Sequence, residues 1–546
     1  MIFSINNSFD NERNYSSLTK TLPYYGLYES CANKKTIYIY CTTERNDTLT
    51  IQYSNSKENS ESNYTSSESY NINNEEKKIA LTPRLNYFRI CLTSADESYI
   101  STYKRIINVY LCESQILLTN DDGNLMIEKN NTTDYDAFGR LRVSNPFTLF
   151  DSANANYKNT KFSEYTTGGN TVSYDVNASV VNLICNASGT VIREGKTICS
   201  YQPGKSLLIL NTFVMNPAQT GLIQRVGYYN DLNGIFLELS GSTLNIVKRS
   251  YSSGSLQTTT ITQENWNTNT LLNSSPVLDI TKSQIFWIDI EWLGVGSVRT
   301  GFIIDGKYYV CHVFNHANII GTYGTYMTSA RLSPRYEITY SGAGSGLGYT
   351  LKQICSSVIS EGGYESKSIV RHIGHTANMT NIPTSGTPSA WIPLIAIKLD
   401  DTSSININGI IIPSQLSLLY DTGNGNGNLL YQIILNPIIT GSGSTPTYTK
   451  YSTTYSADTN SVASCWVNTN ASGTVYSVSG GIVVNAGLLT SGSTVSLSNA
   501  NDFNLQIGRN YTGNNTYTSD ILVLAVKLLS SGNSPELYAQ MGWYEI

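Results

Sequence analysis

The segment 284–292 contains the arrangement of acidic and aromatic residues that is most similar to a reactive site. Asp289 and Glu291 are two positions apart, and Trp287 stands two positions before Asp289. Alternate side chains of an extended strand point to the same face, so one aromatic ring and two carboxylates would lie side by side. Paired carboxylates cleave glycosidic bonds, and aromatic rings make large apolar contacts of the kind that sugars use. Trp287, Asp289 and Glu291 therefore form a candidate glycan-binding face.

The trio resembles the active sites of laminarinase-like glycoside hydrolases, which also place acids at alternate positions of one strand. In that family a further acid follows shortly afterwards, but here the next positions are Trp292, Leu293 and Gly294. We therefore predict no catalytic residue and no enzymatic activity. A purely structural sheet face is the favoured interpretation. A carbohydrate- or receptor-binding module without chemistry stays open as an alternative, and a laminarinase-like glycoside hydrolase is the least favoured one.

Histidines offer the next candidate chemistry, because Cys311, His312 and His316 stand close together in the chain. Four positions along a strand span about 13 Å, which is too far for two side chains to share one ion. Alternation also sends Cys311 and His312 to opposite faces. The pair His372 and His375 is equally weak, so the sequence predicts no metal site and no cofactor.

A glycine-rich segment at 342–348 also needs an interpretation. No Lys-Ser or Lys-Thr follows it at the spacing of a phosphate-binding loop, and no helix pattern begins after it. A Gly-x-Ser-x-Gly nucleophile elbow is absent from the chain. We expect 342–348 to be an ordinary loop.

The strand that carries the trio alternates apolar and polar residues with a period of two. Phe286, Ile288, Ile290 and Trp292 share the face opposite the trio, and we predict that they lie in the core. Such a strand needs partners on both sides, and the chain that follows supplies them.

Asp305-Gly306 separates two further alternating runs, 298–304 and 307–314. Asp-Gly between such runs is the strongest short-range signal of a hairpin with a two-residue turn. Counting outward from this turn places Arg299 opposite His312. A broad sheet with one apolar face resembles the two-sheet sandwich of legume-lectin and laminarinase-like domains.

The composition of the whole chain favours strands. The 546 residues include 42 Gly and 39 Tyr, and only 14% are Asp, Glu, Lys or Arg. Tyr and Thr favour pleated surfaces, and Gly and Asn suit tight turns. The net charge of −5 and the absence of a basic stripe argue against a nucleic-acid partner. We predict an all-β protein with a central two-sheet sandwich, lectin-like or jelly-roll-like, flanked by smaller β-sandwich domains.

No segment approaches the length of apolar sequence that a membrane-spanning helix needs. The first residues also lack the basic and apolar regions of a secretory signal, so we expect the protein to be made in the cytoplasm of a host cell. Nine cysteines without Cys-x-x-Cys pairs are expected to be free, mostly buried thiols.

Turn signals and changes in composition divide the chain into four parts. We expect an N-terminal β domain (1–120), a linker that leads into the central sandwich (121–150), the central sandwich itself (151–380) and a C-terminal sandwich (381–546). The charge runs are concentrated in the first part, around Glu68–Lys78.

Several segments, taken together and in order, resemble structural proteins of tailed phages and large DNA viruses. The most specific is Asp136–Pro146, with the sequence DAFGRLRVSNP, and similar segments recur to about residue 365. These segments are YQPGKS at 201–206, RVGYY at 225–229, NGIFLE at 233–238, EWLGVG at 291–296, IDGK at 304–307 and HVFNHAN at 312–318.

The resemblance implies a virion protein, part of a capsid surface or a fibre, whose partners are other capsid or fibre proteins. It also implies a homo-oligomer, with a trimer expected where a fibre is formed, and a host-surface glycan as an additional partner. Residues 1–120 lie outside the resemblance and carry the charge runs, so they are the expected anchor to the particle.

Overall fold

The computed structural model describes all or nearly all of residues 146–273, 275–319, 324–363, 369–374, 390–421, 428–441, 445–451, 460–468, 476–490, 492–497, 505–529 and 536–546, and short strand segments between residues 3 and 126. The regular structure of this part is strand apart from two single-turn 3-10 helices, η1 (Gln263–Asn265) and η2 (Asn406–Asn408). The prediction of an all-β protein is confirmed. No helix among the described residues is long and apolar enough to cross a membrane. The chain divides into two compact units, Met1–Asn130 and Asn131–Ile546.

The first unit contains two antiparallel sheets and a small core. One sheet has the order β1 (Phe3–Ile5), β9 (Arg105–Cys112), β4 (Thr36–Thr43), β7 (Glu76–Leu81). The other has the order β2 (Tyr24–Tyr25), β8 (Tyr87–Ser94), β5 (Asn46–Ser54), β6 (Ser66–Asn73), and β3 (Glu29–Ser30) also pairs with β8. Two short strands, β10 (Leu118–Thr119) and β11 (Leu125–Met126), pair with each other. Buried side chains such as Leu49, Ile51 and Ile90 form the core of this unit.

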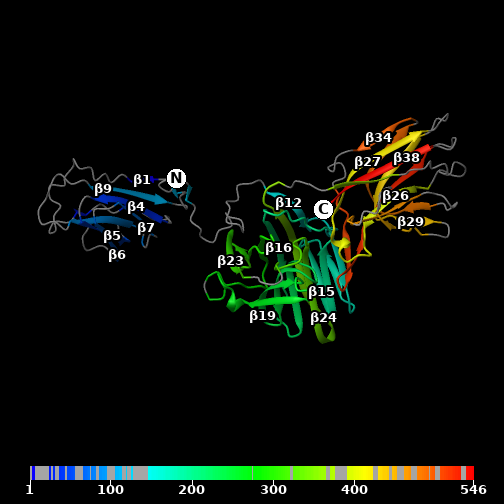
Figure 1. Cartoon of the computed structure of the whole chain (residues 1–546). Helices are drawn as coiled ribbons and strands as arrows, with labels where there is room; N and C mark the ends of the chain where they lie inside the picture. The colour runs from blue at the N-terminus through cyan, green and yellow to red at the C-terminus, as the bar shows by residue number, and fades with distance from the viewer. Residues whose placement is uncertain are drawn as a thin grey trace. The chain divides into compact units, whose positions relative to one another are not determined.

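The second unit begins with a curled 13-stranded sheet (Figure 1). Its main path runs β20 (Gln257–Thr262), β19 (Thr243–Ser250), β18 (Gly234–Ser240), β17 (Leu222–Tyr229), β24 (Pro334–Ser360), β16 (Leu207–Val214), β21 (Gln284–Ile290), β22 (Val298–Ile304), β23 (Lys307–Phe314). The remaining strands are β12 (Phe147–Ala153), β13 (Phe162–Thr166), β14 (Thr171–Asp175) and β15 (Val180–Gly195).

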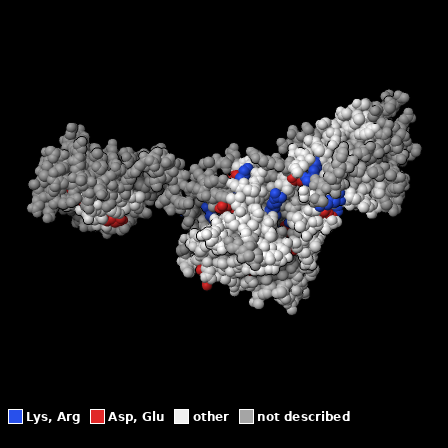
Figure 2. All heavy atoms as spheres, in the orientation of Figure 1, with Lys and Arg blue, Asp and Glu red and all other residues white. Residues whose placement is uncertain are grey.

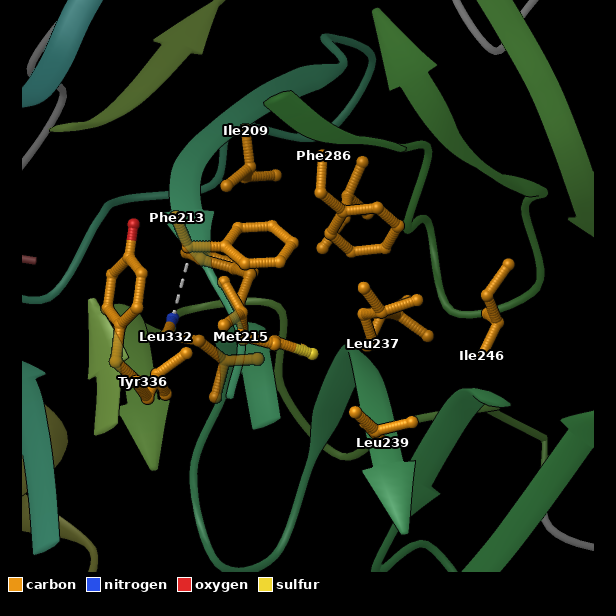
Figure 3. Close-up of a cluster of buried hydrophobic side chains, with 14 of the residues drawn as sticks. Ile209, Phe213, Met215, Leu237, Leu239, Ile246, Phe286, Leu332 and Tyr336 are labelled. Atoms are coloured by element: carbon orange, nitrogen blue, oxygen red, sulfur yellow. Dashed lines mark hydrogen bonds between the residues drawn. The ribbon is translucent and has the colours of Figure 1, made fainter. Parts of the chain in front are cut away.

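Two long strands, β15 and β24, join the two layers of this sandwich. The first part of β24 pairs with β17, and its last part pairs with β16. One large core then fills the space between the layers. Figure 3 shows the contact: Ile209, Phe213 and Phe286 face Leu237 and Ile246.

The glycine-rich segment 342–348 lies inside β24, so the prediction of an ordinary loop is wrong. Gly344, Gly346 and Gly348 have positive φ angles, which glycine adopts without a steric penalty. The register with β15 shifts on both sides of Ala187, and pairing then continues. The glycines therefore bend a continuous strand from one layer to the other, which a local pattern of turn residues does not reveal.

The C-terminal sandwich has a second core between two antiparallel sheets. The four-stranded sheet has the order β25 (Ile369–Gly374), β38 (Glu536–Glu545), β27 (Ile411–Asp421), β34 (Thr494–Leu497). The six-stranded sheet has the order β30 (Thr449–Lys450), β31 (Ala463–Val467), β26 (Ile392–Leu399), β37 (Ile521–Leu528), β28 (Asn428–Leu435), β33 (Ile482–Thr490). Two further hairpins are β29 (Ile438–Gly441) with β32 (Tyr476–Ser479), and β35 (Arg509–Gly513) with β36 (Thr516–Ser519).

The predicted inward face of β21 is confirmed. Phe286, Ile288 and Ile290 are fully buried in the central core, and Trp292 packs against it from just beyond the strand. The cysteine prediction is also confirmed where it can be followed. Cys185, Cys199, Cys311 and Cys465 are buried free thiols, and Cys355 is a half-buried one.

Charged side chains occupy small, separate patches of the surface that Figure 2 colours. No continuous basic area appears on the described part of that face. This distribution is consistent with the low charge content of the sequence.

Candidate functional site

The outer face of β21 is buried around Trp287. The Trp287 side chain is fully buried and forms a small apolar cluster with Leu208 and Val310. The ring centroid lies 5.7 Å from that of Tyr308 in an edge-to-face arrangement. A ring enclosed in this way does not present a face on which a sugar could stack.

Asp289 is held in an ion pair on the same side of β21. It lies directly opposite Arg299 of β22, and the guanidinium donates a hydrogen bond to its carboxylate. The Asp289 side chain is fully buried, and that of Arg299 is mostly buried. A buried carboxylate needs such a partner, because an isolated buried charge is very costly. The chemistry of Asp289 in this setting is that of a structural ion pair.

Glu291 lies just beyond the end of β21, in the turn that leads to β22. Its backbone N–H donates to Ser297 O over 3.0 Å, and Gly296 N–H donates to Trp292 O over 2.8 Å. A Cβ at Gly296 would lie 2.5 Å from Glu291 Cγ, so the acidic side chain packs directly on this glycine. The structure thus buries Trp287 and Asp289 on the same face of β21 and places Glu291 in a tight turn. The glycan face formed by these three residues stays a prediction, and the burial of Trp287 and Asp289 disfavours it.

The predicted pairing of Arg299 with His312 is wrong. Ile304 pairs with Lys307 across the Asp305-Gly306 turn as expected, but the register shifts between Thr300 and Gly301. Thr300 therefore lies opposite His312, and Arg299 lies opposite Val313. The bulge adds one residue to one strand, and a two-residue turn alone does not determine the pairing beyond it.

His316 is a buried histidine with both ring nitrogens in use. Nε2 lies 3.0 Å from Lys248 Nζ, and Nδ1 lies 2.6 Å from Gly296 O. Because the ammonium can only donate and the carbonyl can only accept, His316 is a neutral ring that carries its proton on Nδ1. Burial and the nearby Lys248 charge hold its pKa low, at about 4, although the bond to Gly296 opposes this shift.

His312 is separate from His316 in its contacts. Its Nδ1 accepts a hydrogen bond from Asn267 N–H over 3.3 Å. Burial, with a smaller effect of Lys248, lowers its pKa. His372 is half-buried in β25, and His375 lies outside the described residues. Within the described parts of the chain, no three His, Cys, Asp or Glu side chains are placed to hold a metal ion.

The segments YQPGKS (201–206), NGIFLE (233–238), EWLGVG (291–296) and HVFNHAN (312–318) contribute many internal contacts of the central sandwich. Tyr201 packs edge-to-face on Trp292 with centroids 5.7 Å apart, and its hydroxyl accepts a hydrogen bond from Leu293 N–H. The His316 ring stacks on Tyr326 at 3.9 Å. These segments are far apart in sequence, so periodicity within any one of them could not reveal the contacts. Asp136–Asn145 lies outside the described residues.

Asn233 and Tyr228 connect the same set of segments to the chain after Tyr326. Asn233 donates a hydrogen bond to Thr328 Oγ1 over 2.6 Å and accepts one from Thr328 N–H over 3.0 Å. The Tyr228 hydroxyl donates to Ala330 O over 3.0 Å. These polar side chains therefore fix the segment after Tyr326 in place.

A buried ionic cluster joins the central and C-terminal sandwiches, and the sequence analysis missed it. Glu194 of β15 accepts hydrogen bonds from Arg335 and from Arg509, each over 3.0 Å, and from the Tyr517 hydroxyl over 3.2 Å. Arg509 and Tyr517 belong to the hairpin of β35 and β36, whose Arg509 N–H also donates to Lys196 O over 2.8 Å. The hairpin thus inserts two side chains of the C-terminal sandwich into a charged site of the central one.

Arg335 extends this cluster toward Asp231 and Glu337. It contacts the Asp231 carboxylate at 2.9 Å and that of Glu337 at 2.8 Å. Burial alone would raise the pKa of Glu337, but Arg335 and Arg225 lower it to about 2. Arg335 and Glu337 are neighbours on one strand, but Asp231 and Glu194 stand more than 100 positions before Arg335, and Arg509 stands more than 300 positions after Glu194. This separation is why no local pattern indicates the cluster.

The outer face of the C-terminal four-stranded sheet carries a groove with a volume of about 370 Å³. Its described walls come from all four strands, β25, β38, β27 and β34. The side chains that point outward along this face are Ser417, Leu419, Thr494, Ser496, Tyr538 and Gln540. None of the described lining residues is charged.

Comparison with known proteins gives similarity to solved structures only. No family model matches the chain, and no curated protein matches it.

Among solved structures, a protein of unknown function from Shewanella oneidensis is 10% identical to this chain and has a TM-score of 0.28. The similarity covers 42% of this chain and 92% of that protein. A GH16 protein of a Bacteroides ovatus mixed-linkage-glucan locus, solved with a product, is 12% identical, with 38% and 99% covered and a TM-score of 0.28. The Crh5 transglycosylase solved with NAG is 13% identical, with 40% and 84% covered and a TM-score of 0.26. At such identities and TM-scores, these similarities carry no conclusion about function.

Proposed function

We propose that this chain is a non-enzymatic structural protein of a virus particle, part of a capsid surface or of a fibre. The observation that supports the proposal most is the use of the side chains in the segments that resemble virion proteins. Tyr201, Asn233, Trp292 and His316 make internal contacts that hold distant segments of one sandwich together. Side chains used in this way serve a rigid scaffold.

The acidic residues of the candidate hydrolytic site favour the same function. Asp289 is fully buried and ion-paired with Arg299, and Glu291 packs on Gly296 in a turn. A glycosidase needs one carboxyl group as an acid and a second as base or nucleophile, both in reach of the sugar. A Asp289→Asn/Glu291→Gln double variant should therefore show the same activity on a polysaccharide panel as the parent chain. Cleavage of a polysaccharide by the parent chain that is lost in a double variant that still melts cooperatively would contradict the non-enzymatic assignment.

Self-association belongs to the proposal because the curled sheet has strand edges. Its described path ends at β20 on one side and at β23 on the other. Strand edges carry backbone groups that pair readily with another chain, and symmetric oligomers commonly cover such surfaces. We expect a homo-oligomer, a trimer in the case of a fibre, and light scattering of the purified full chain measures the number directly.

Particle membership is tested by mass spectrometry of purified particles from the host that carries the gene. The full chain should be present in many copies, and a chain without residues 1–120 should fold but fail to join the particles. Absence of the full chain from the particles would refute the virion role. Normal incorporation of the truncated chain would show that the anchor lies elsewhere.

A further inference from the structure

The groove on the C-terminal sandwich has a regular architecture. In the cross-strand register, Ser417 lies between Ser496 on one side and Gln540 on the other, and Gln540 lies opposite Gly374. These four positions form one row across all four strands of the sheet. Because β-strand side chains alternate, the row projects outward, away from the second core.

A second row lies beside the first. Leu419 pairs with Thr494 on one side and with Tyr538 on the other. Leu419 and Thr494 are exposed, and Tyr538 is half-buried. The neighbouring positions Leu418 and Ala539 point to the opposite side and belong to the core. The described lining of the groove therefore belongs to packed strands.

The lining has the chemistry of a site for a neutral, polyhydroxylated ligand. Serine and threonine hydroxyls and the Gln540 amide can each donate and accept hydrogen bonds, as sugar hydroxyls do. The Tyr538 ring offers an apolar surface with a polar tip. No described lining residue would attract or repel a charged ligand. The volume of about 370 Å³ falls within the range of small-molecule sites.

Gly374 lines the groove without a side chain. A Cβ built there would lie 3.5 Å from Ala539 O and 3.7 Å from Gln540 Cβ. These are ordinary contact distances, and the φ angle of Gly374 is not in the positive range that only glycine adopts easily. Glycine is thus not required by the backbone at this position, and its effect is to leave space in the groove.

We propose that this groove binds a neutral glycan, with Tyr538 and Gln540 as the principal contacts. The site is distinct from the face of Trp287, Asp289 and Glu291, which lies on the central sandwich. The proposal does not rest on the virion role, because it concerns the purified protein. Within that role, the groove would serve to attach the particle to sugars on a host surface.

The test uses the full chain on an array of neutral and acidic oligosaccharides, followed by calorimetric titration with the neutral oligosaccharide that binds best. Gly374→Val should place a branched side chain in the groove and weaken binding at least tenfold while leaving the melting temperature nearly unchanged. Tyr538→Ala should weaken it similarly. Tyr251→Ala, which removes an exposed tyrosine of the central sandwich, is the matched control and should bind like the parent chain.

Three results would overturn the proposal. The array could show no neutral glycan bound, or only acidic glycans. Alternatively, Gly374→Val and Tyr538→Ala could both bind as tightly as the control. Finally, Gly374→Val could change the oligomeric state in light scattering, which would identify the groove as a contact between copies of the chain. None of these results depends on particle incorporation, so a failure here is distinguishable from a failure of the virion role.

Discussion

At the scale of single residues, Asp289 is the clearest case of an acid used for stability. Its carboxylate is fully buried, and Arg299 is its partner across the strand pair. Asp289→Asn leaves the mostly buried guanidinium without its counter-charge, so we expect a loss of about 2–4 kcal/mol in the free energy of unfolding. Urea denaturation measures this loss. Asp305→Asn in the exposed turn of the same hairpin is the control, because asparagine also suits that turn. Equal stability of the two variants would contradict the structural assignment of Asp289.

His316 makes the stability of the central sandwich depend on pH. Its pKa in the folded chain is about 4, below its ordinary value of 6.5, so the unfolded chain binds the proton more readily. Stability from this group is fully present above pH 6.5 and is lost as the pH falls toward 4. We expect the melting temperature to drop over this range, and less steeply in His316→Gln, which cannot take up the proton. His372→Gln is the control and should follow the parent chain, and an unchanged slope in His316→Gln would refute the assignment.

At the scale of elements, the alternation in β21 leads to a sharp prediction. Ile288 is fully buried in the central core, so Ile288→Asp would bury a charge without a partner. That cost exceeds the few kcal/mol by which a domain is normally stable, so the variant should not give soluble, folded protein. Ile482→Asp is the matched control, since Ile482 is exposed in β33 and should tolerate the change. Soluble protein with a cooperative melting transition for Ile288→Asp would show that Ile288 does not lie in the core.

The same hairpin shows which features of the fold the sequence can predict. Period-two alternation identified the inward face of β21, and Asp305-Gly306 identified the turn, because both signals are local. The bulge after Thr300 moved Arg299 away from His312, and the glycines of 342–348 bend β24 where a loop was expected. Burial of Trp287 depends on Leu208 and Val310 from other strands. Register, bending and burial on a second face are decided by distant partners, and local patterns carry no information about them.

At the scale of the whole molecule, Glu194 couples the two sandwiches of the second unit. It accepts hydrogen bonds from Arg335 of its own sandwich and from Arg509 and Tyr517 of the other. Glu194→Gln removes the negative charge between two buried guanidinium groups, which typically costs about 3–5 kcal/mol. This loss of stabilising free energy weakens the contact between the two sandwiches. We therefore expect calorimetry to show one joint transition for the two sandwiches of the parent chain and two separate transitions for the variant. Glu264→Gln, at an exposed position, should leave the joint transition unchanged.

Hydrogen exchange locates the effect of Glu194→Gln along the chain. The amide of Arg509, which donates a hydrogen bond to Lys196 O, should exchange faster in this variant than in the parent chain. The amide of Ile288 in the central core should exchange at the same rate in both. A single transition in the variant, with both amides equally protected, would show that apolar packing between the sandwiches couples them without the ionic cluster.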